Sequence, residues 1–360
     1  MADSALKRLE LRWRSAVMHT AARLAPRPLR AGPPDWDARQ YRVLYLRYDR
    51  IGDMIMATGL LRAIAMSHPT IQLDVLASPS NAPVLTGNPY VHRVLQFDRK
   101  RKATLPSVLR MLRQGRYDAV VDGSVLIPSV TMMLLMLATG APYRIGIGGR
   151  RNDFIYTLPV PPAPPHLHAI EQAAQTAIPF GVPPESTSWH TELFLEPDEL
   201  ARAEAFWGPR TCAPRLLVNV SAFTRDRQWP LERYAAVVRH ARQLEPNARV
   251  VVIAAPAEQA AALPVAQASG AELAHTASVR DAFALVATAD AVFTPDTSIA
   301  HAAAATDTPV AVMFKGGWTL HAPYRAREVR LEADEPSLAN LPVERALGAL
   351  EQLLAMVRTA

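Results

Sequence analysis

The stretch at residues 43–62 limits the fold of this chain more than any other part of its sequence. It begins with a short apolar run, which is typical of a strand buried on both faces of a parallel sheet. A polar turn with Gly52 and Asp53 follows, and apolar residues then recur at helical spacing as far as Ala65. Strand, turn and helix in this order predict the start of a βαβ unit. Ligands bind at the carboxyl ends of the strands in such sheets, and we expect Asp53 there, in the first turn of the helix.

Length and composition narrow the class of protein. A chain of 360 residues with 49% hydrophobic and 20% charged residues predicts a globular protein of two domains. The single cysteine, Cys212, excludes a disulfide framework and a multi-thiolate metal site, and it is typical of a reducing cytosol. The net charge of +6 favours anionic partners, namely nucleotide phosphates, acidic lipid or nucleic acid.

Membrane insertion is not expected from the sequence. The most apolar segment, residues 125–138, is interrupted by Pro128 and falls short of the ~20 residues that cross a bilayer. We predict a buried helix there. The N-terminus lacks the compact apolar core and the cleavage site of a secretory signal, so we expect a cytoplasmic protein.

The N-terminal segment is basic and amphipathic. Residues 1–40 contain eight Lys or Arg and four Asp or Glu, and the apolar side chains of residues 6–24, Trp13 among them, share one helical face. Two interpretations remain open: a helix that binds an anionic membrane surface, and a helix that packs on its own domain. Prolines between residues 26 and 34 then predict a stiff linker.

The first half of the chain alternates strands with helices, which predicts a doubly wound parallel sheet. After the opening strand, we expect strands at residues 71–77, 94–97, 117–121 and 143–146. A basic run at residues 99–102, with further arginines downstream, has two interpretations. It is either a solvated face or a contact for the phosphates of an acidic acceptor or a membrane surface.

A proline-rich segment at residues 159–188 predicts the crossover between two domains. Within it, His166, His168 and Glu171 have the residue types of a metal site. No further group of candidate ligands lies nearby in the sequence, so the crossover is the favoured interpretation.

The second half repeats the pattern of the first. We expect strands at residues 215–220, 249–254, 272–274, 291–294 and 309–314, and helices at residues 231–244, 279–288 and 342–356. We also expect a helix that Pro256 and Glu258 begin and an alanine-rich helix after residues 295–301. No Gly-x-Gly-x-x-Gly sequence follows any of these strands, which disfavours a dehydrogenase. We therefore predict an α/β protein with two Rossmann-like domains that face a central cleft, the GT-B architecture. The expected parts are an N-terminal segment and linker at 1–40, a domain at 41–185, a domain at 186–341 and a closing helix at 342–360, whose packing against the first domain is left open.

Two features of the second half suit a nucleotide diphosphate. Asp296, Thr297 and Ser298 stand between a strand and a helix, where unsatisfied backbone N–H groups favour an anion, although helix capping alone also explains them. The loop at residues 221–227 offers hydroxyls and two guanidiniums, and arginine can grip a pyrophosphate through paired donors. Its alternative is a surface loop with Trp229 packed inward.

Three motifs in order carry a family resemblance. They are Arg-Tyr-Asp-Arg-Ile-Gly-Asp-Met-Ile-Met-Ala-Thr at residues 47–58, a Ser/Thr-rich loop with a basic residue before Trp229-Pro230, and Asp-Thr-x-x-x-His at 296–301. Together with Arg-Ile-Gly at residues 144–146, they resemble the heptosyltransferase-type glycosyltransferases of family 9. The resemblance runs from about residue 42 to the C-terminus.

The resemblance implies roles for individual residues. Asp53 is implied to be the general base, although helix capping is the simpler explanation of an acidic residue there. The residues implied to bind the donor are Ser221, Thr224, Arg227, Glu258, Asp296, Thr297, Ser298 and His301, with Glu258 on the ribose and His301 either on phosphate or packed. Further contacts to phosphate or acceptor are implied for Gly52, Arg50 and Lys315.

Departures from the family pattern leave the nucleobase and the sugar open. Arg227 stands where the family usually has lysine, Ser298 replaces a frequent glycine, and Gln228 and the loop at residues 314–319 also differ. The resemblance implies an inverting, metal-independent glycosyltransferase without a cofactor. Its implied donor is a nucleotide sugar, ADP-heptose, and its implied acceptor is a lipid-linked saccharide of the lipopolysaccharide-core type at the inner face of the cytoplasmic membrane.

Other functions remain as alternatives. They are a GT-B enzyme with another donor or acceptor, such as a sugar-nucleotide epimerase, and a non-catalytic protein that binds a nucleotide sugar. Nucleic-acid binding rests on charge alone, because the chain lacks a recognition-helix motif or a basic sheet interleaved with aromatic residues, so no nucleic-acid partner is expected.

Overall fold

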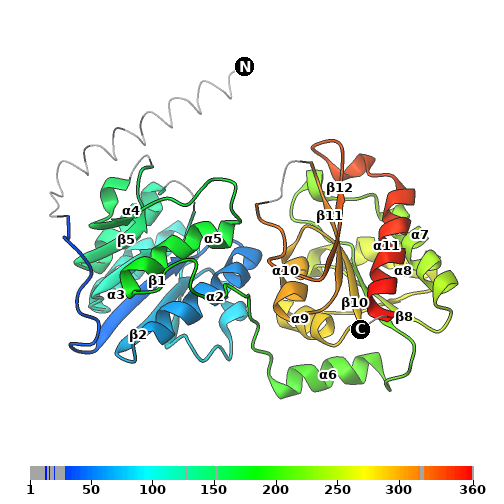
Figure 1. The fold of residues 1–360 in the computed structure, drawn as a ribbon. Coiled ribbons are helices and arrows are strands. Elements are labelled where there is room, and N and C mark those ends of the chain that lie inside the picture. Colours follow the sequence, from blue (N-terminus) through cyan, green and yellow to red (C-terminus); the bar gives the residue numbers. More distant parts are fainter. Residues whose placement is uncertain are drawn as a thin grey trace. The chain divides into compact units, whose positions relative to one another are not determined.

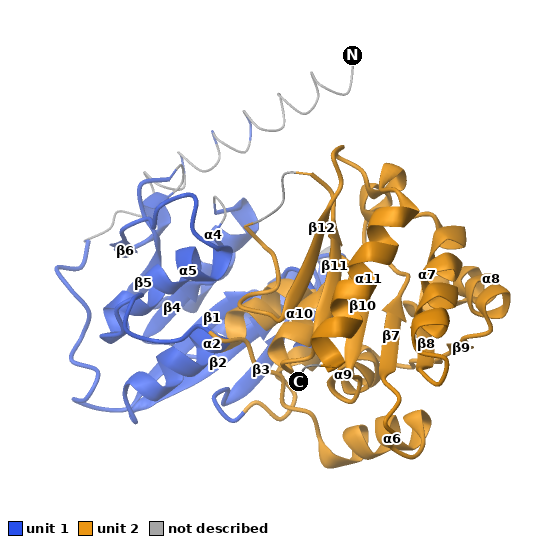
Figure 2. Ribbon diagram, turned by 45° about the vertical axis from the view of Figure 1, so that its right-hand side comes forward, with its two compact units in different colours: residues 1–50, 59–82, 89–189 blue, residues 51–58, 83–88, 190–360 orange. Residues whose placement is uncertain are grey.

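The computed structural model describes residues 13, 16, 20, 29–125, 128–150, 153–316 and 320–358. The amphipathic segment at residues 6–24 therefore lies almost wholly outside the described residues. The chain divides into two compact units (Figure 2). The first unit comprises residues 1–50, 59–82 and 89–189, and the second unit comprises residues 51–58, 83–88 and 190–360.

The first unit is built on a six-stranded sheet in which every pairing is parallel (Figure 1). The strand order is β3-β2-β1-β4-β5-β6. The strands are β1 Tyr41–Arg47, β2 Ile71–Ala77, β3 Arg93–Gln96, β4 Ala119–Asp122, β5 Tyr143–Ile147 and β6 Leu158–Val160. The α-helices are α2 Ile51–Ser67, α3 Leu105–Gln114, α4 Val130–Thr139 and α5 Ala169–Ala173. The 3-10 helices are η1 Ala82–Leu85, η2 Lys102–Thr104, η3 Asp153–Ile155 and η4 Ala174–Phe180.

The second unit repeats this architecture with the strand order β12-β11-β10-β7-β8-β9, again all parallel. The strands are β7 Arg215–Asn219, β8 Arg249–Ile253, β9 Glu272–Leu273, β10 Ala291–Pro295, β11 Val310–Phe314 and β12 Glu328–Glu332. The α-helices are α6 Pro197–Trp207, α7 Leu231–Leu244, α8 Gln259–Ser269, α9 Val279–Ala287, α10 Ser298–Ala305 and α11 Val343–Arg358. The 3-10 helices are η5 Arg225–Arg227, η6 Pro256–Glu258 and η7 Leu338–Asn340.

Each sheet is covered by apolar helix faces. In the first unit, α3 and α4 pack against each other and against the strands, and α4 is the buried helix expected at residues 125–138. In the second unit, α7, α8 and α11 line one face of the sheet while α9 and α10 lie on the other (Figure 1). The closing helix α11 buries Leu350 and Leu353 in the core of the second unit.

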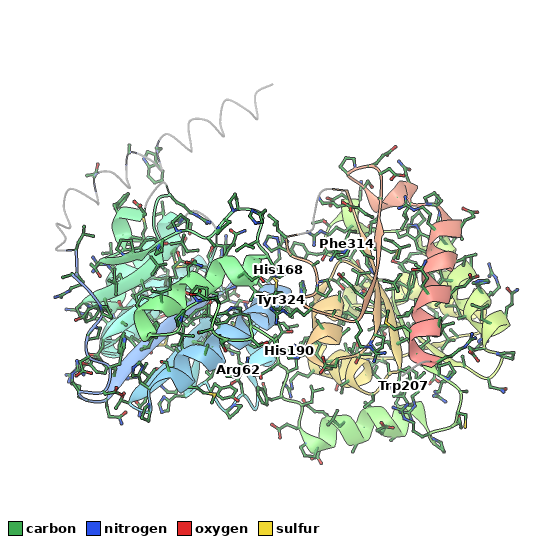
Figure 3. The ribbon with its side chains drawn as sticks, viewed as in Figure 1. Arg62, His168, His190, Trp207, Phe314 and Tyr324 are labelled. Atoms are coloured by element: carbon green, nitrogen blue, oxygen red, sulfur yellow. The ribbon has the colours of Figure 1, made fainter. Side chains whose placement is uncertain are left out.

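Two edge strands and one helix were not predicted. β6 contains Pro159, which lacks an N–H, and an edge strand is where a sheet tolerates proline. β12 alternates buried and exposed residues at the other sheet's edge. Helix α6 begins with a capping box between Glu196 and Glu199 and ends at the buried Trp207, which is labelled in Figure 3. The indole N–H of Trp207 donates a hydrogen bond to Thr288 at 3.0 Å.

Two of the three candidate metal ligands in the proline-rich segment, His168 and Glu171, cap a helix. His168 caps helix α5 by accepting a hydrogen bond from the N–H of Ile170, and Glu171 completes the capping box by accepting from the N–H of His168. Across the described parts of the chain, no group of three or more His, Cys, Asp or Glu side chains is placed to hold a metal ion. Within the same residues, no helix has the length and apolar character needed to cross a bilayer.

Candidate functional site

The carboxyl edge of the second sheet gathers polar residues from distant parts of the sequence. β11, β10 and β7 are neighbours in this sheet and run in the same direction. Lys315 follows β11, whose last residue Phe314 is labelled in Figure 3. Asp296 follows β10, and the loop with η5 follows β7. These three chain segments therefore meet at one edge, where parallel sheets bind their ligands.

Thr297 starts the helix that follows β10. It is the N-cap residue of α10, and its hydroxyl accepts a hydrogen bond from the N–H of Ile299 at 3.3 Å. The buried amide of Asn219, at the end of β7, donates to the hydroxyls of Thr294 at 2.9 Å and Thr297 at 3.2 Å. Capping thus accounts for Thr297, and Ser298 is the first residue of the helix. Asn219 holds the two strand ends together, and the only sequence signal for it is an amide that ends an apolar strand.

Two ion pairs link the loops at this edge. The guanidinium of Arg227 lies 2.9 Å from Oδ2 of Asp296, and both side chains are largely buried. The ammonium of Lys315 is paired with the carboxylate of Asp226. Lys315, aided by the hydroxyl of Thr224, lowers the pKa of Asp226 to about 2. The structure therefore brings together four of the expected residues, and it adds Asp226, which the sequence did not single out.

Ser221 and Glu258 flank the same loop. The hydroxyl of Ser221 accepts a hydrogen bond from the N–H of Ala255 at 2.6 Å, which ties the loop after β7 to the end of β8. Oε1 of Glu258 accepts from the amide of Gln228 at 3.3 Å. Oε2 of Glu258 is enclosed and accepts no hydrogen bond from the described residues. Such an atom is a candidate for a ligand's donor group. Trp229 packs inward, as one interpretation of this loop expected, and its N–H donates to the carbonyl of Leu341.

Helix α2 brings Asp53 into the second unit. The N-cap of α2 is Arg50, which makes no side-chain capping bond, and Asp53 lies half-buried in the first turn, so Asp53 is not the N-cap residue of this helix. Residues 51–58 belong to the second unit (Figure 2). There Gly52 lies against the buried ring of His301: a Cβ on residue 52 would be 2.6 Å from Cδ2 of the imidazole. The first turn of α2 is therefore in contact with α10.

The remaining expected residue, Arg50, belongs to the first unit. Its side chain is exposed, and its carbonyl accepts a hydrogen bond from the amide of Asn81 at 3.4 Å. This carbonyl contact ties the start of α2 to the turn after β2.

The carboxyl edge of the first sheet carries a different arrangement, built around Asp122 at the end of β4. This carboxylate is 1% exposed and accepts hydrogen bonds from the hydroxyl of Tyr156 at 2.8 Å and from the N–H of Ser124 at 2.9 Å. Burial raises the pKa of Asp122 to about 6. Arg47 donates to the carbonyl of Gly123 at 2.6 Å. Sequence reasoning missed this network, whose only signal is an acidic residue that ends an apolar strand.

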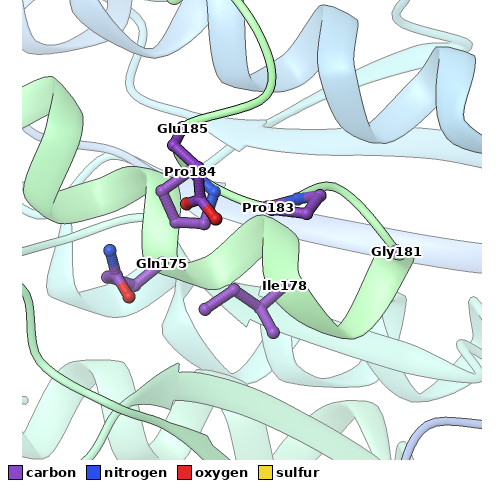
Figure 4. A pocket seen from close by; sticks show the side chains of 6 residues that line it. All are labelled: Gln175, Ile178, Gly181, Pro183, Pro184 and Glu185. Atoms are coloured by element: carbon purple, nitrogen blue, oxygen red, sulfur yellow. The ribbon is translucent and has the colours of Figure 1, made fainter.

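An open depression lies in the first unit beside η4 (Figure 4). It is lined by Gln175, Ile178, Gly181, Pro183, Pro184 and Glu185. One carboxylate and one amide among apolar residues and prolines do not form the convergent set of polar groups that a small-molecule site needs. The candidate site is therefore the carboxyl edge of the second sheet together with the first turn of α2.

Two six-stranded parallel sheets, each flanked by helices, are the architecture of the GT-B glycosyltransferases, and solved heptosyltransferase structures share it. The sequence model of glycosyltransferase family 9 (heptosyltransferase) matches residues 106–342. This match covers more than half of the chain, and the chain therefore belongs to that family. It is accordingly a glycosyltransferase, and both the expected architecture and the expected enzyme class are confirmed.

Three relatives illustrate the similarity. The lipopolysaccharide core heptosyltransferase OpsX of Haemophilus influenzae is 23% identical over 281 residues, which span 75% of this chain and 77% of OpsX. A family 9 glycosyl transferase of Veillonella parvula DSM 2008 superposes with a TM-score of 0.77 at 17% identity, over 90% of this chain and 99% of that one. E. coli heptosyltransferase WaaC, solved with ADP-2-deoxy-2-fluoro heptose, gives a TM-score of 0.70 at 19% identity, over 86% and 99% of the two chains.

Proposed function

We propose that this chain is an inverting, metal-independent heptosyltransferase that moves heptose from ADP-heptose to an acceptor of the lipopolysaccharide-core type. Its family and the name of its relative OpsX support the class of donor and acceptor. The observation that carries the proposal is the meeting of Arg227 and Lys315 beside the start of α10. Two cations and the N-terminus of a helix together suit the diphosphate of a nucleotide sugar.

The second unit supplies the proposed donor site. Arg227 and Lys315 neutralise the charge that develops on the leaving diphosphate, so that the protein provides this stabilisation through its own cations. The backbone N–H groups at Ser298 face the same anion. Ser221 and Thr224 line the loop, and the enclosed Oε2 of Glu258 accepts a hydrogen bond from a ribose hydroxyl.

Asp53 is the proposed general base. Its carboxylate accepts the proton of the acceptor hydroxyl while the acceptor oxygen forms a bond to the anomeric carbon. The bond between that carbon and the diphosphate oxygen breaks, the diphosphate leaves with the electron pair, and the configuration inverts. The position of Asp53 in the first turn of α2 supports this role, because Gly52 brings that turn against α10 in the second unit. His301 positions this contact by packing.

In this proposal, the domain at residues 41–185 binds the acceptor and the domain at residues 186–341 binds the donor. Exposed arginines on and beside α3, at positions 99, 110, 113 and 116, suit a phosphorylated acceptor or an anionic lipid surface. A peripheral position on the inner face of the cytoplasmic membrane, through residues 6–24, completes the proposal.

Nucleotide binding and sugar transfer test the proposal separately. Thermal-shift titrations compare ADP, UDP and GDP, and we expect the largest stabilisation with ADP. A preference for UDP or GDP would assign another donor within the same fold. A transfer assay with ADP-heptose and a lipid-linked core saccharide then measures turnover with and without EDTA, and we expect product of inverted configuration in both. Nucleotide binding without any transfer would show a non-catalytic binding protein.

A further inference from the structure

The proposed donor site contains two carboxylates as well as two cations. Lys315 is paired with Asp226, and Arg227 is paired with Asp296, so the four charges cancel. All four residues belong to the second unit. A diphosphate that binds at this edge therefore meets cations that the chain's own carboxylates already neutralise. The two carboxylates repel the diphosphate and compete with it for the cations' donors, and this opposition falls when one carboxylate gives up its place.

The two ion pairs differ in how firmly they are held. In the pair of Arg227 and Asp296, the side chains are 13% and 7% exposed, and the backbone N–H of Asp296 is bonded to the carbonyl of Met313. In the pair of Lys315 and Asp226, the side chains are 17% and 39% exposed. Separating buried charges costs far more free energy than separating exposed ones. Asp226 is therefore the carboxylate that can leave.

We propose that Asp226 is a built-in competitor of the donor: its carboxylate occupies Lys315 in place of a phosphate, and a nucleoside diphosphate binds by displacing it. The pair of Arg227 and Asp296 stays intact during this exchange. The inference rests on the proposed function only in placing a diphosphate at this edge, and it holds for any nucleobase.

The exchange is driven by an anion and not by a proton. Lys315 and Thr224 hold the pKa of Asp226 far below neutrality, so the carboxylate remains charged throughout the physiological range. A phosphate brings more charge than the carboxylate it replaces, and it also accepts from the N–H groups at the start of α10. Asp226 thereby lowers the affinity for every ligand that uses Lys315, and it prevents a weak monoanion from holding the site.

The test is isothermal titration of the full chain with inorganic pyrophosphate, ADP, UDP and GDP at constant ionic strength. In the Asp226→Asn variant, an amide of the same size leaves the charge of Lys315 available, and we expect about twofold to fivefold tighter binding of each diphosphate. Adenosine, which has no phosphate, is expected to bind both forms equally. In a Lys315→Met background, the gain from Asp226→Asn should vanish.

Glu272→Gln is the matched control. It removes one negative charge from an exposed ion pair with Arg249 at the amino edge of the same sheet, and its affinity for diphosphates should equal that of the wild type. An equal gain in this control would reduce the effect to net charge and overturn the inference. Unchanged or weaker binding in Asp226→Asn would also overturn it, since Asp226 would then position Lys315. A wild-type preference for UDP or GDP would refute the ADP-heptose donor alone, whereas no diphosphate binding by any form would refute both proposals.

Discussion

The carboxyl edges of the two sheets use the same residue type in opposite ways. In the first unit, Asp122 ends β4 and is surrounded by the neutral donors Tyr156 and Ser124, and its burial raises its pKa. In the second unit, Asp226 stands in the loop after β7 and faces Lys315, which lowers its pKa. A buried carboxylate with neutral partners fixes a loop, whereas an exposed one with a cation can be exchanged. Repetition of a fold therefore does not repeat the chemistry of its edge.

The largest effect on activity is expected at Asp53, which is part of neither the Asp122 network nor the pair of Asp226 and Lys315. If proton transfer rests on this residue, Asp53→Asn lowers kcat about 10²–10⁴-fold, because general-base assistance is lost while the donor site remains intact. Steady-state kinetics measure kcat, and nucleotide affinity from titration serves as the control. Turnover at the wild-type rate would remove Asp53 from the mechanism.

The buried ion pair of the second unit gives the next effect. Arg227→Met removes the cation beside the buried Asp296, and we expect a loss of about 3 kcal/mol in the free energy of unfolding. Diphosphate binding should be lost as well. Urea denaturation measures the first quantity, and Arg227→Lys is the matched variant that keeps the charge. If the methionine variant is as stable as the lysine variant, the pair contributes nothing and the contrast between the two edges weakens.

The buried carboxylate of the first unit predicts a pH dependence. The pKa of Asp122 is raised from 3.8 to about 6, so the folded state binds a proton more tightly than the unfolded state. Its contribution to stability is therefore full below pH 4 and is lost as the pH rises through 6, with a total of about 2–3 kcal/mol. Denaturation of the wild type and of Asp122→Asn at pH 4, 5, 6 and 7 measures it. A difference in the free energy of unfolding between the two proteins that does not change with pH would contradict the raised pKa.

The smallest effect has the opposite sign. The pKa of Asp226 is lowered from 3.8 to about 2, so its ion pair stabilises the fold above pH 4, and this contribution is lost as the pH falls through 2. Solvent screens this exposed pair, and we expect less than about 1 kcal/mol. Acid titration of stability in the wild type and in Asp226→Asn detects it. If the two carboxylates differ as described, the contribution of Asp122 to the free energy of unfolding falls with rising pH and that of Asp226 rises. Contributions that change in the same direction would contradict the comparison.

Much of the architecture could be predicted from the sequence, because buried parallel strands are continuous apolar runs. Helix α7 was expected at its observed bounds, and the strands of both sheet centres were found within one or two residues. The edge strands β6 and β12 escaped because one contains a proline and the other alternates with charges. Strands buried on both faces of a parallel sheet are continuous apolar runs, and neither edge strand has such a run.

The candidate site could be predicted only where a local motif marks it. Asp53 and Thr297 stand at strand-to-helix turns that the sequence displays, although the roles of both remain proposals. The pairing of Asp226 with Lys315 joins residues 89 positions apart, and Asn219 reaches Thr294 over 75 positions. Such contacts depend on the strand order of the sheet, which periodicity does not reveal. The direction of a pKa shift depends on these contacts, so it cannot be predicted before the fold is known.

Because Gly52 has no side chain, the first turn of α2 can lie directly against His301 of α10. An added methyl group at this position would overlap the imidazole of His301, so the helix carrying Asp53 would have to withdraw or the ring would have to rotate. Shrinking the ring in the same molecule, as in Gly52→Ala combined with His301→Ala, would reopen the space. The absence of a side chain at Gly52 therefore determines how close Asp53 lies to α10.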